Sequence, residues 1–245
     1  KKDPISVHVD TPLEEVVQVI EKYDLVAVPV VDSIGRLVGR ITVDDVMDEV
    51  REQAERDYQL ASGLSQDVES HDNVFRQTTA RLPWLLIGML GGIGNSMILG
   101  NFDTTFAAHP EMALYIPLIG GTGGNVGTQS SALVVQGLAN SSLDSGNTFQ
   151  QILKESVVAL INATIISMLV YIYNFIRFGA TATVSYSVSI SLFAVVMFAS
   201  IFGTLVPMTL EKLKIDPAIA TGPFISITND IIGMMMYMGI TVLLS

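Results

Sequence analysis

The 245-residue chain is 49% hydrophobic and only 15% charged, and its mean hydropathy of +0.49 predicts a protein largely embedded in a membrane. The formal net charge of −11 excludes nucleic acid as a partner, because nucleic-acid binding requires a basic surface, and it favours cations instead. The sequence contains no cysteine, which excludes disulfides and thiolate metal sites.

Charge is distributed unevenly along the chain. Residues 1–80 contain 8 Lys and Arg against 17 Asp and Glu, a balance of −9, whereas residues 81–245 contain 5 against 7, a balance of −2. This partition predicts a mixed fold, in which a small α/β unit precedes an all-α membrane domain of five helices. We expect four parts: the α/β unit at 1–43, an acidic connecting helix at 44–64, a linker at 65–81 and the membrane domain at 82–245.

The first part has the hydrophobic periodicity of a β-α-β-β-α arrangement. Alternating and helically spaced apolar residues predict a strand at 5–9, a helix at 13–23, and strands at 26–32 and 37–42. This order, with the motifs VPVVD, GRLVGRIT and T-x-x-D, resembles a single CBS (cystathionine β-synthase) repeat. The resemblance implies that Thr42 and Asp45 contact the ribose of an adenine nucleotide such as ATP. A regulatory or dimerising module without a ligand is the alternative.

The helix expected from Val43 carries an apolar stripe, and carboxylates crowd the rest of its surface. The stripe has helical spacing and consists of Val43, Val46, Met47, Val50, Ala54 and Tyr58. Like charges three or four residues apart repel each other, and a divalent cation would relieve that repulsion. We therefore expect Glu49, Glu52 and Asp57 to bind regulatory Mg²⁺. The alternative is a solvated acidic face.

Five apolar segments follow, each close to the ~20 residues that a membrane-spanning helix needs. They lie at 82–100, 111–139, 150–178, 186–210 and 215–244. Arg177 falls on one side of these segments. The other flanking basic residues fall on the opposite side: Arg76, Arg81, Lys154, Lys212 and Lys214. The positive-inside rule then predicts a multi-pass protein of the plasma (inner) membrane, with its N-terminal side in the cytoplasm and its C-terminus outside.

The last apolar segment contains one carboxylate, Asp230, near its middle, with Ser226 and Asn229 beside it. A charged side chain at membrane depth costs about 2.5–3.5 kcal/mol on insertion scales, so it normally faces a cavity or a partner. The pattern favours a path for cations through the membrane, and we expect Asp230 to bind the ion while Ser226 and Asn229 line this pore. The alternative is a neutral Asp that is hydrogen-bonded to a neighbouring helix.

The second apolar segment is rich in glycine and also carries amide side chains. Its sequence PLIGGTGGNVGTQSS places Asn125 and Gln129 four residues apart, with Gly124 and Thr128 beside them. Small residues in a membrane helix let backbones approach closely, and polar groups beside them can line a path. We expect these four residues to line a pore, although glycine-mediated helix packing is an alternative. A phosphate-binding loop is excluded, because no Lys-Ser/Thr follows the glycines.

The two membrane motifs, PLIGGTGGNVGTQSS and DPAIATGPFISITNDIIG, together resemble the MgtE family of magnesium channels. The RLPWLL entry to the first apolar segment, the single CBS repeat and the acidic helix follow that family in order. The resemblance implies a homodimer with five transmembrane helices per subunit, in which the second and fifth line the pore and Asp230 holds a hydrated Mg²⁺. It also implies that the acidic helix closes the pore when cytosolic Mg²⁺ is high. The helical N-terminal domain and first CBS repeat that usually contribute to sensing are not in this sequence.

The function expected from the sequence is passive conduction of hydrated Mg²⁺ through a dimeric, Mg²⁺-gated pore. Mg²⁺ and membrane lipid are the expected partners. No enzymatic activity is expected, because neither a phosphate-binding motif nor an acyl-transfer constellation is present. Two alternatives stay open: a secondary divalent-cation transporter coupled to Na⁺ or H⁺, and a membrane-anchored nucleotide sensor.

Overall fold

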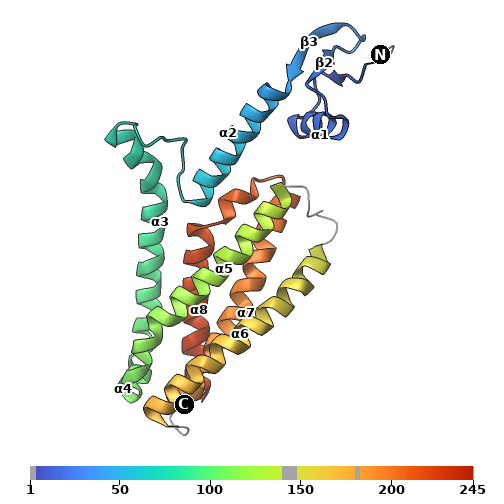
Figure 1. The fold of residues 1–245 in the computed structure, drawn as a ribbon. Helices are drawn as coiled ribbons and strands as arrows, with labels where there is room; N and C mark the ends of the chain where they lie inside the picture. Colours follow the sequence, from blue (N-terminus) through green and yellow to red (C-terminus); the bar gives the residue numbers. More distant parts are fainter. Residues whose placement is uncertain (1–3, 140–147, 180–182, 245) are drawn as a thin grey trace. The chain divides into compact units, whose positions relative to one another are not determined.

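A computed structural model describes residues 4–139, 148–179 and 183–244 (Figure 1). The chain divides into two compact units, Lys1–Asp57 and Tyr58–Ser245. The expectation of a small α/β unit followed by a predominantly helical membrane part is confirmed.

The first unit is a three-stranded sheet with helices packed on it. Its elements are β1 (Val7–His8), α1 (Leu13–Tyr23), β2 (Ala27–Val31), β3 (Leu37–Thr42) and the first part of α2 (Val43–Ala61). Strand β2 is central, parallel to β1 and antiparallel to β3, with Val28 opposite Ile41. The core consists of apolar residues from the sheet and both helices: Val7, Val16, Ile20, Val28 and Val46.

The apolar stripe expected on α2 is only partly buried. Val46 joins the core of the first unit, but Met47 and Tyr58 are 60% and 74% exposed. Periodicity therefore identified the helix correctly, while it overstated how much of the stripe is packed within the described part of this chain.

In its described residues, the second unit contains five long helices and three short ones, in addition to the end of α2. The long helices are α3 (Val74–Gly100), α5 (Ile116–Ala139), α6 (Thr148–Phe178), α7 (Thr183–Lys212) and α8 (Pro223–Leu244). The short ones are α4 (Asp103–Ala108), η1 (Pro110–Tyr115) and η3 (Pro217–Ala220). Among the described residues, α3, α6, α7 and α8 are long and apolar enough to cross a membrane. Helix α5 is long enough, but its glycines and amides lower its hydropathy.

Three of the long helices begin five or more residues away from the start that the sequence predicted. Helix α3 begins at Val74 rather than at 82, because the Asn73 side chain accepts a hydrogen bond of 2.9 Å from the Arg76 amide and caps a polar first turn. Helix α5 begins at 116 and α8 at 223, since a 3-10 turn precedes each of them.

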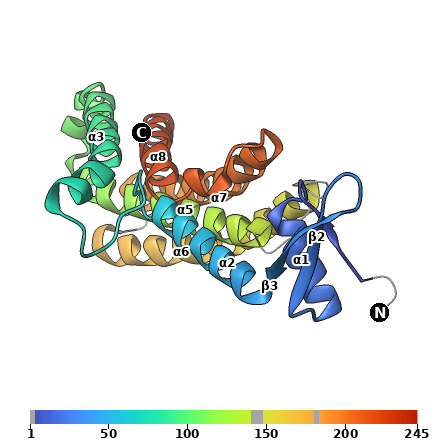
Figure 2. The same ribbon diagram turned by 90° about the horizontal axis from the view of Figure 1, so that it is seen from above.

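Helix α7 is at the centre of the second unit. It packs along α5, α6 and α8 and is the most buried of the four membrane-length helices. Helix α8 lies between α3 and α7 and also packs on α5 (Figures 1 and 2). The main core lies where η1, α5, α7 and α8 meet, and its largest fully buried side chains include Tyr237, Met112, Ile119 and Leu192.

The start of α8 is held against the end of α2 by two glycines with left-handed backbone conformations. Gly63 has φ +79°, and a Cβ placed on it would lie 2.6 Å from the ring carbon Cγ of Pro223. Gly222 has φ +54°, and a Cβ there would overlap the carbonyl oxygen of Ala61. Both positions therefore require glycine, for conformation and for space.

Helices α5 and α7 cross with their backbones in close contact. A Cβ on Gly203 of α7 would overlap the carbonyl group of Gly127 on α5. Backbone atoms cannot rotate away as a flexible side chain can, so this crossing requires that Gly203 has no side chain.

We predict that Gly203→Ala lowers the midpoint of thermal unfolding of the detergent-solubilised chain, because overpacking a close contact costs about 1–3 kcal/mol. Gly94→Ala is the matched control, since a Cβ at Gly94 of α3 meets no atom within 4 Å. Equal midpoints for the two variants would show that the α5–α7 crossing is looser than described.

Candidate functional site

Asp230 lies in the third turn of α8, on the same face as Ser226. The two residues are four positions apart, which places their side chains one above the other on a helix. Both are partly buried. Asn229, the neighbour of Asp230, is 1% exposed. Together with Thr228, these three residues form a short polar segment in a largely apolar helix.

The glycine-rich face of α5 packs against this polar segment. A Cβ on Gly124 would lie 2.9 Å from the Ser226 hydroxyl and 3.4 Å from Oδ1 of Asp230, and a Cβ on Gly120 would lie 3.5 Å from the same Oδ1. The glycines therefore leave the space that the hydroxyl and the carboxylate occupy. The structure thus brings together Gly124, Ser226 and Asp230, three residues that the sequence analysis assigned to a pore.

The amide of Asn229 is pressed against α5 one turn further along. A Cβ on Gly127 would overlap Nδ2 of Asn229. Neither Nδ2 nor Oδ1 of this amide makes a hydrogen bond with any described residue. A buried amide without a partner is unusual and needs an explanation, such as a water molecule or an ion shell.

The polar residues of α5 are not all on the face that meets Asp230. At about 100° per residue, Asn125 and Gln129 are rotated by about 100° or more from Gly124, and both are exposed. Thr128 uses its hydroxyl within its own helix, where it donates to the carbonyl oxygen of Gly124 at 3.0 Å. The assignment of Asn125, Thr128 and Gln129 to one pore lining remains a prediction.

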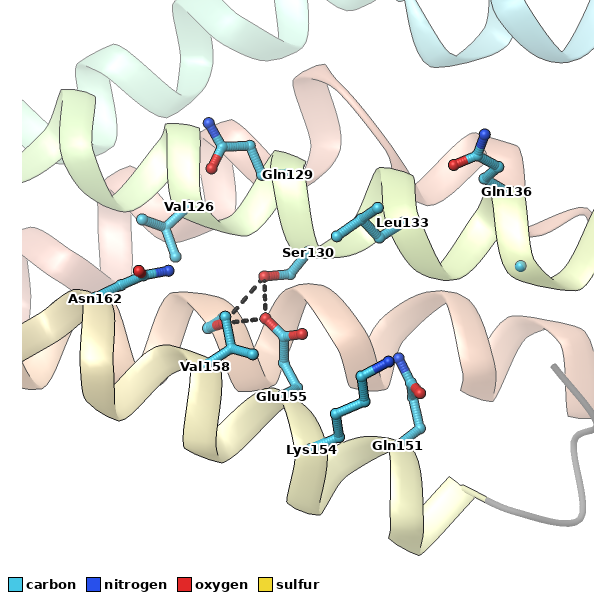
Figure 3. A pocket seen from close by; sticks show the side chains of 12 residues that line it. Val126, Gln129, Ser130, Leu133, Gln136, Gln151, Lys154, Glu155, Val158 and Asn162 are labelled. Atoms are coloured by element: carbon cyan, nitrogen blue, oxygen red, sulfur yellow. Dashed lines mark hydrogen bonds between the residues drawn. The ribbon is translucent and has the colours of Figure 1, made fainter. Parts of the chain in front are cut away.

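A second polar site, which the sequence analysis missed, contains Glu155 of α6. Its Oε1 accepts a hydrogen bond of 2.6 Å from the Ser130 hydroxyl on α5 and another from the Ser200 hydroxyl on α7 (Figure 3). The carboxylate lines a cavity of about 430 Å³, which Gln129 also lines. A signal was present, because Glu155 is a carboxylate inside an apolar segment, the feature that drew attention to Asp230.

The predicted regulatory carboxylates of α2 all have partners on their own helix. Arg56 donates to Oε1 of Glu52 at 2.7 Å and to Oε1 of Glu49 at 3.1 Å. The hydrogen bond with Glu49 is the main reason why the pKa of Arg56 is raised above its ordinary value. Asp57 accepts a hydrogen bond of 2.9 Å from Gln53. Within the described ranges, no three His, Asp or Glu side chains converge as metal ligands.

Thr42 and Asp45 form a capping box at the start of α2. Oδ2 of Asp45 accepts from the Thr42 amide at 3.0 Å and from the Thr42 hydroxyl at 2.5 Å. The Thr42 hydroxyl in turn accepts from the Asp45 amide at 3.4 Å. These bonds, led by the one from the hydroxyl, lower the pKa of Asp45. The T-x-x-D motif therefore has a structural role whether or not a nucleotide binds.

Taken together, the long apolar helices with polar residues in their middle define a multi-pass membrane protein. The chain belongs to the MgtE family: the family model, described as a divalent cation transporter, matches residues 116–240. A CBS domain model matches residues 1–52.

Curated relatives agree with this assignment. The chain is 34% identical over 227 residues to the magnesium transporter MgtE of Bacillus subtilis, covering 93% of this chain and 50% of that protein. It is 33% identical over 246 residues to the magnesium transporter MgtE of Thermus thermophilus, covering 98% of this chain and 53% of that protein. The chain thus spans about half the length of the curated relatives it matches.

We predict that Thr42→Ala accelerates amide hydrogen exchange in the first turn of α2 roughly fivefold, as expected for a lost N-cap. The hydrogen bond from the Thr42 hydroxyl to Oδ2 of Asp45 stabilises the ionised carboxylate, and it is the main reason why the pKa of Asp45 is lowered in the fold. Its contribution is therefore complete above the ordinary carboxyl pKa and is lost as the pH falls through the lowered one.

Hydrogen-exchange mass spectrometry of the full chain measures this effect, with Asp48→Ala in the next turn as the control. If Thr42→Ala leaves the exchange rate unchanged at neutral pH, the capping role is refuted.

Proposed function

We propose that this chain forms the pore of a Mg²⁺-selective channel that conducts hydrated Mg²⁺ through a homodimer. The observation that carries the proposal is the Asp230 carboxylate, placed within an apolar helix and given room by Gly120 and Gly124 of α5. The family match and the names of the relatives support a divalent cation, Mg²⁺, as the transported ion.

The chemistry around Asp230 suits a hydrated dication. Mg²⁺ loses its waters reluctantly and is usually bound through one or two carboxylates with several waters retained. Two subunits would supply two copies of Asp230. The Ser226 hydroxyl and the Asn229 amide, whose nitrogen and oxygen lack partners among the described residues, can hydrogen-bond to the waters of such an ion.

Conduction would be driven by the membrane potential. A dication gains about 4.6 kcal/mol per 100 mV, twice the value for one elementary charge. The basic residues at one end of the apolar segments support an orientation with the N-terminal side in the cytoplasm of a cell whose plasma (inner) membrane holds the protein. Potential and orientation would then both favour uptake.

Gating is proposed to depend on the acidic helix, residues 44–64 in the four-part division given above. Arg56 pairs with both Glu49 and Glu52. The helix has only two arginines, Arg51 and Arg56, against seven carboxylates: Asp44, Asp45, Asp48, Glu49, Glu52, Glu55 and Asp57. Mg²⁺ would lower the mutual repulsion of these carboxylates and favour the closed state. The CBS unit would hold this helix, with Thr42 and Asp45 as its cap.

For the pore, Asp230→Asn is expected to lower Mg²⁺ flux into proteoliposomes by at least about tenfold, because one charged contact with the ion shell is lost. The side chain keeps its shape, so folding is preserved. Flux is measured with a Mg²⁺-sensitive dye inside the vesicles at a fixed membrane potential.

Asp216→Asn is the matched control, since Asp216 caps η3 at a helix end and Asn caps equally well. Undiminished Mg²⁺ flux through the Asp230 variant would rule out the pore assignment. Flux that stops when a Na⁺ or proton gradient is collapsed at constant potential would instead identify a coupled transporter.

For gating, the triple variant Glu49→Gln, Glu52→Gln and Asp57→Asn should remain open at internal Mg²⁺ concentrations that close the unmodified chain, because the charges that attract Mg²⁺ are gone. Single-channel recording with Mg²⁺ added on the α2 side measures open probability.

The control for the gating experiment removes three charges from α1 and its end instead. Glu15→Gln, Glu21→Gln and Asp24→Asn change the same net charge in exposed residues of the same unit. If both triple variants close at the same Mg²⁺ concentration as the unmodified chain, the three carboxylates of α2 are not the sensor.

A further inference from the structure

A polar groove lies between α5 and α6 in the membrane unit. Both helices pack along α7, and the hydrogen bond of 2.6 Å between Ser130 of α5 and Glu155 of α6 joins them directly. The cavity between them has a volume of about 430 Å³ and lining residues from all three helices. Figure 3 shows it with α5 on one side and α6 on the other. This groove contains neither Asp230 nor Ser226.

Glu155 places a negative charge in the groove. Two serine hydroxyls, from Ser130 and Ser200, both hydrogen-bond to its Oε1. The residue is 8% exposed. Its second oxygen, Oε2, makes no hydrogen bond to a described residue. The carboxylate is therefore oriented by one oxygen while the other keeps its capacity to accept a hydrogen bond.

Lys154 places a positive charge beside this carboxylate. It is exposed, lines the same cavity and has no ion-pair partner in the part of the chain that the structure describes. Figure 3 shows the side chains of Lys154, Glu155 and Gln151 extending from α6 toward α5. Gln129, Gln136 and Asn162 add further amides around the two charges. The groove thus presents both signs of charge together with neutral donors and acceptors.

The depth and size of the groove suit a lipid head group. Glu155 is two turns after the first residue of α6, about 10 Å along the helix axis at 1.5 Å per residue. Head groups occupy the outer part of the ~40–45 Å bilayer, beyond the ~30 Å hydrocarbon core. A single ion would leave most of the cavity empty, since a water molecule occupies about 30 Å³. Leu133 and Val158, exposed apolar residues of the lining, offer contacts for acyl chains.

We propose that this groove binds the head group of a zwitterionic phospholipid that carries a primary ammonium, the chemistry of phosphatidylethanolamine. The ammonium donates to Oε2 of Glu155, and the phosphate pairs with Lys154. The surrounding amides bind the remaining phosphate and glycerol oxygens. A choline head group has the same charges, but it cannot donate a hydrogen bond to the carboxylate.

Native mass spectrometry of the full chain, purified from mixed vesicles with equal amounts of phosphatidylethanolamine and phosphatidylcholine, tests the proposal. The unmodified chain should retain the ethanolamine lipid about tenfold over the choline lipid, the value of one charged hydrogen bond. Glu155→Gln and Lys154→Met should each abolish that preference. Millimolar phosphoethanolamine should compete with the lipid if the head group is what the groove recognises.

The matched controls are Glu211→Gln and Lys212→Met, an adjacent and exposed pair of the same charges at the end of α7. They should leave the preference unchanged. If Glu155→Gln fails to fold, Leu133→Trp fills the groove from an exposed position and should also abolish the preference. Equal retention of both lipids by the unmodified chain, or a preference that survives Lys154→Met and Leu133→Trp, would overturn the proposal. Neither outcome bears on Mg²⁺ conduction.

Discussion

The contact between the glycine face of α5 and the polar segment of α8 is the constraint on which the membrane unit depends. Gly124 leaves room for Ser226 and Asp230, and Gly127 leaves room for Asn229. Gly127 also receives the backbone of α7 at Gly203. The glycine face of α5 therefore positions both α7 and α8. A carboxylate can be placed within apolar helices only because the space for it is set by backbone atoms, which do not move with rotamers.

The fold and part of the candidate site could be predicted from the sequence. Hydrophobic periodicity located the strands and α1 to within a few residues, because each of these segments has one face in a small core. Asp230 was identifiable because a lone carboxylate in an apolar segment is expensive. The glycines of α5 were identifiable as a group, but which of them meet α8 depends on helix rotation, and no sequence motif states that rotation.

Glu155 shows why the rest was missed. Like Asp230 it is a carboxylate in an apolar segment, but it follows Lys154 and lies near a helix end, where charged residues are ordinary. Its significance comes from Ser130 and Ser200, which lie 25 and 45 positions away in the sequence. Only packing on α7 brings these hydroxyls together. The position of Gln129 could not be predicted for the same reason. Its four-residue spacing from Asn125 does not show which neighbouring helix each amide faces, and Gln129 lines the cavity at Glu155.

The joint between Gly63, Gly222 and their neighbours has a mechanical consequence. The residues at the end of α2 and at the start of α8 are in close contact, because Ala61 packs on Gly222 and Gly63 packs on Pro223. A shift of the last turn of α2 would therefore displace Pro223, which lies two turns before Asp230 in α8. A motion of α2 can in this way reach Asp230, the residue that we propose holds the ion, without any rearrangement of the bundle interior.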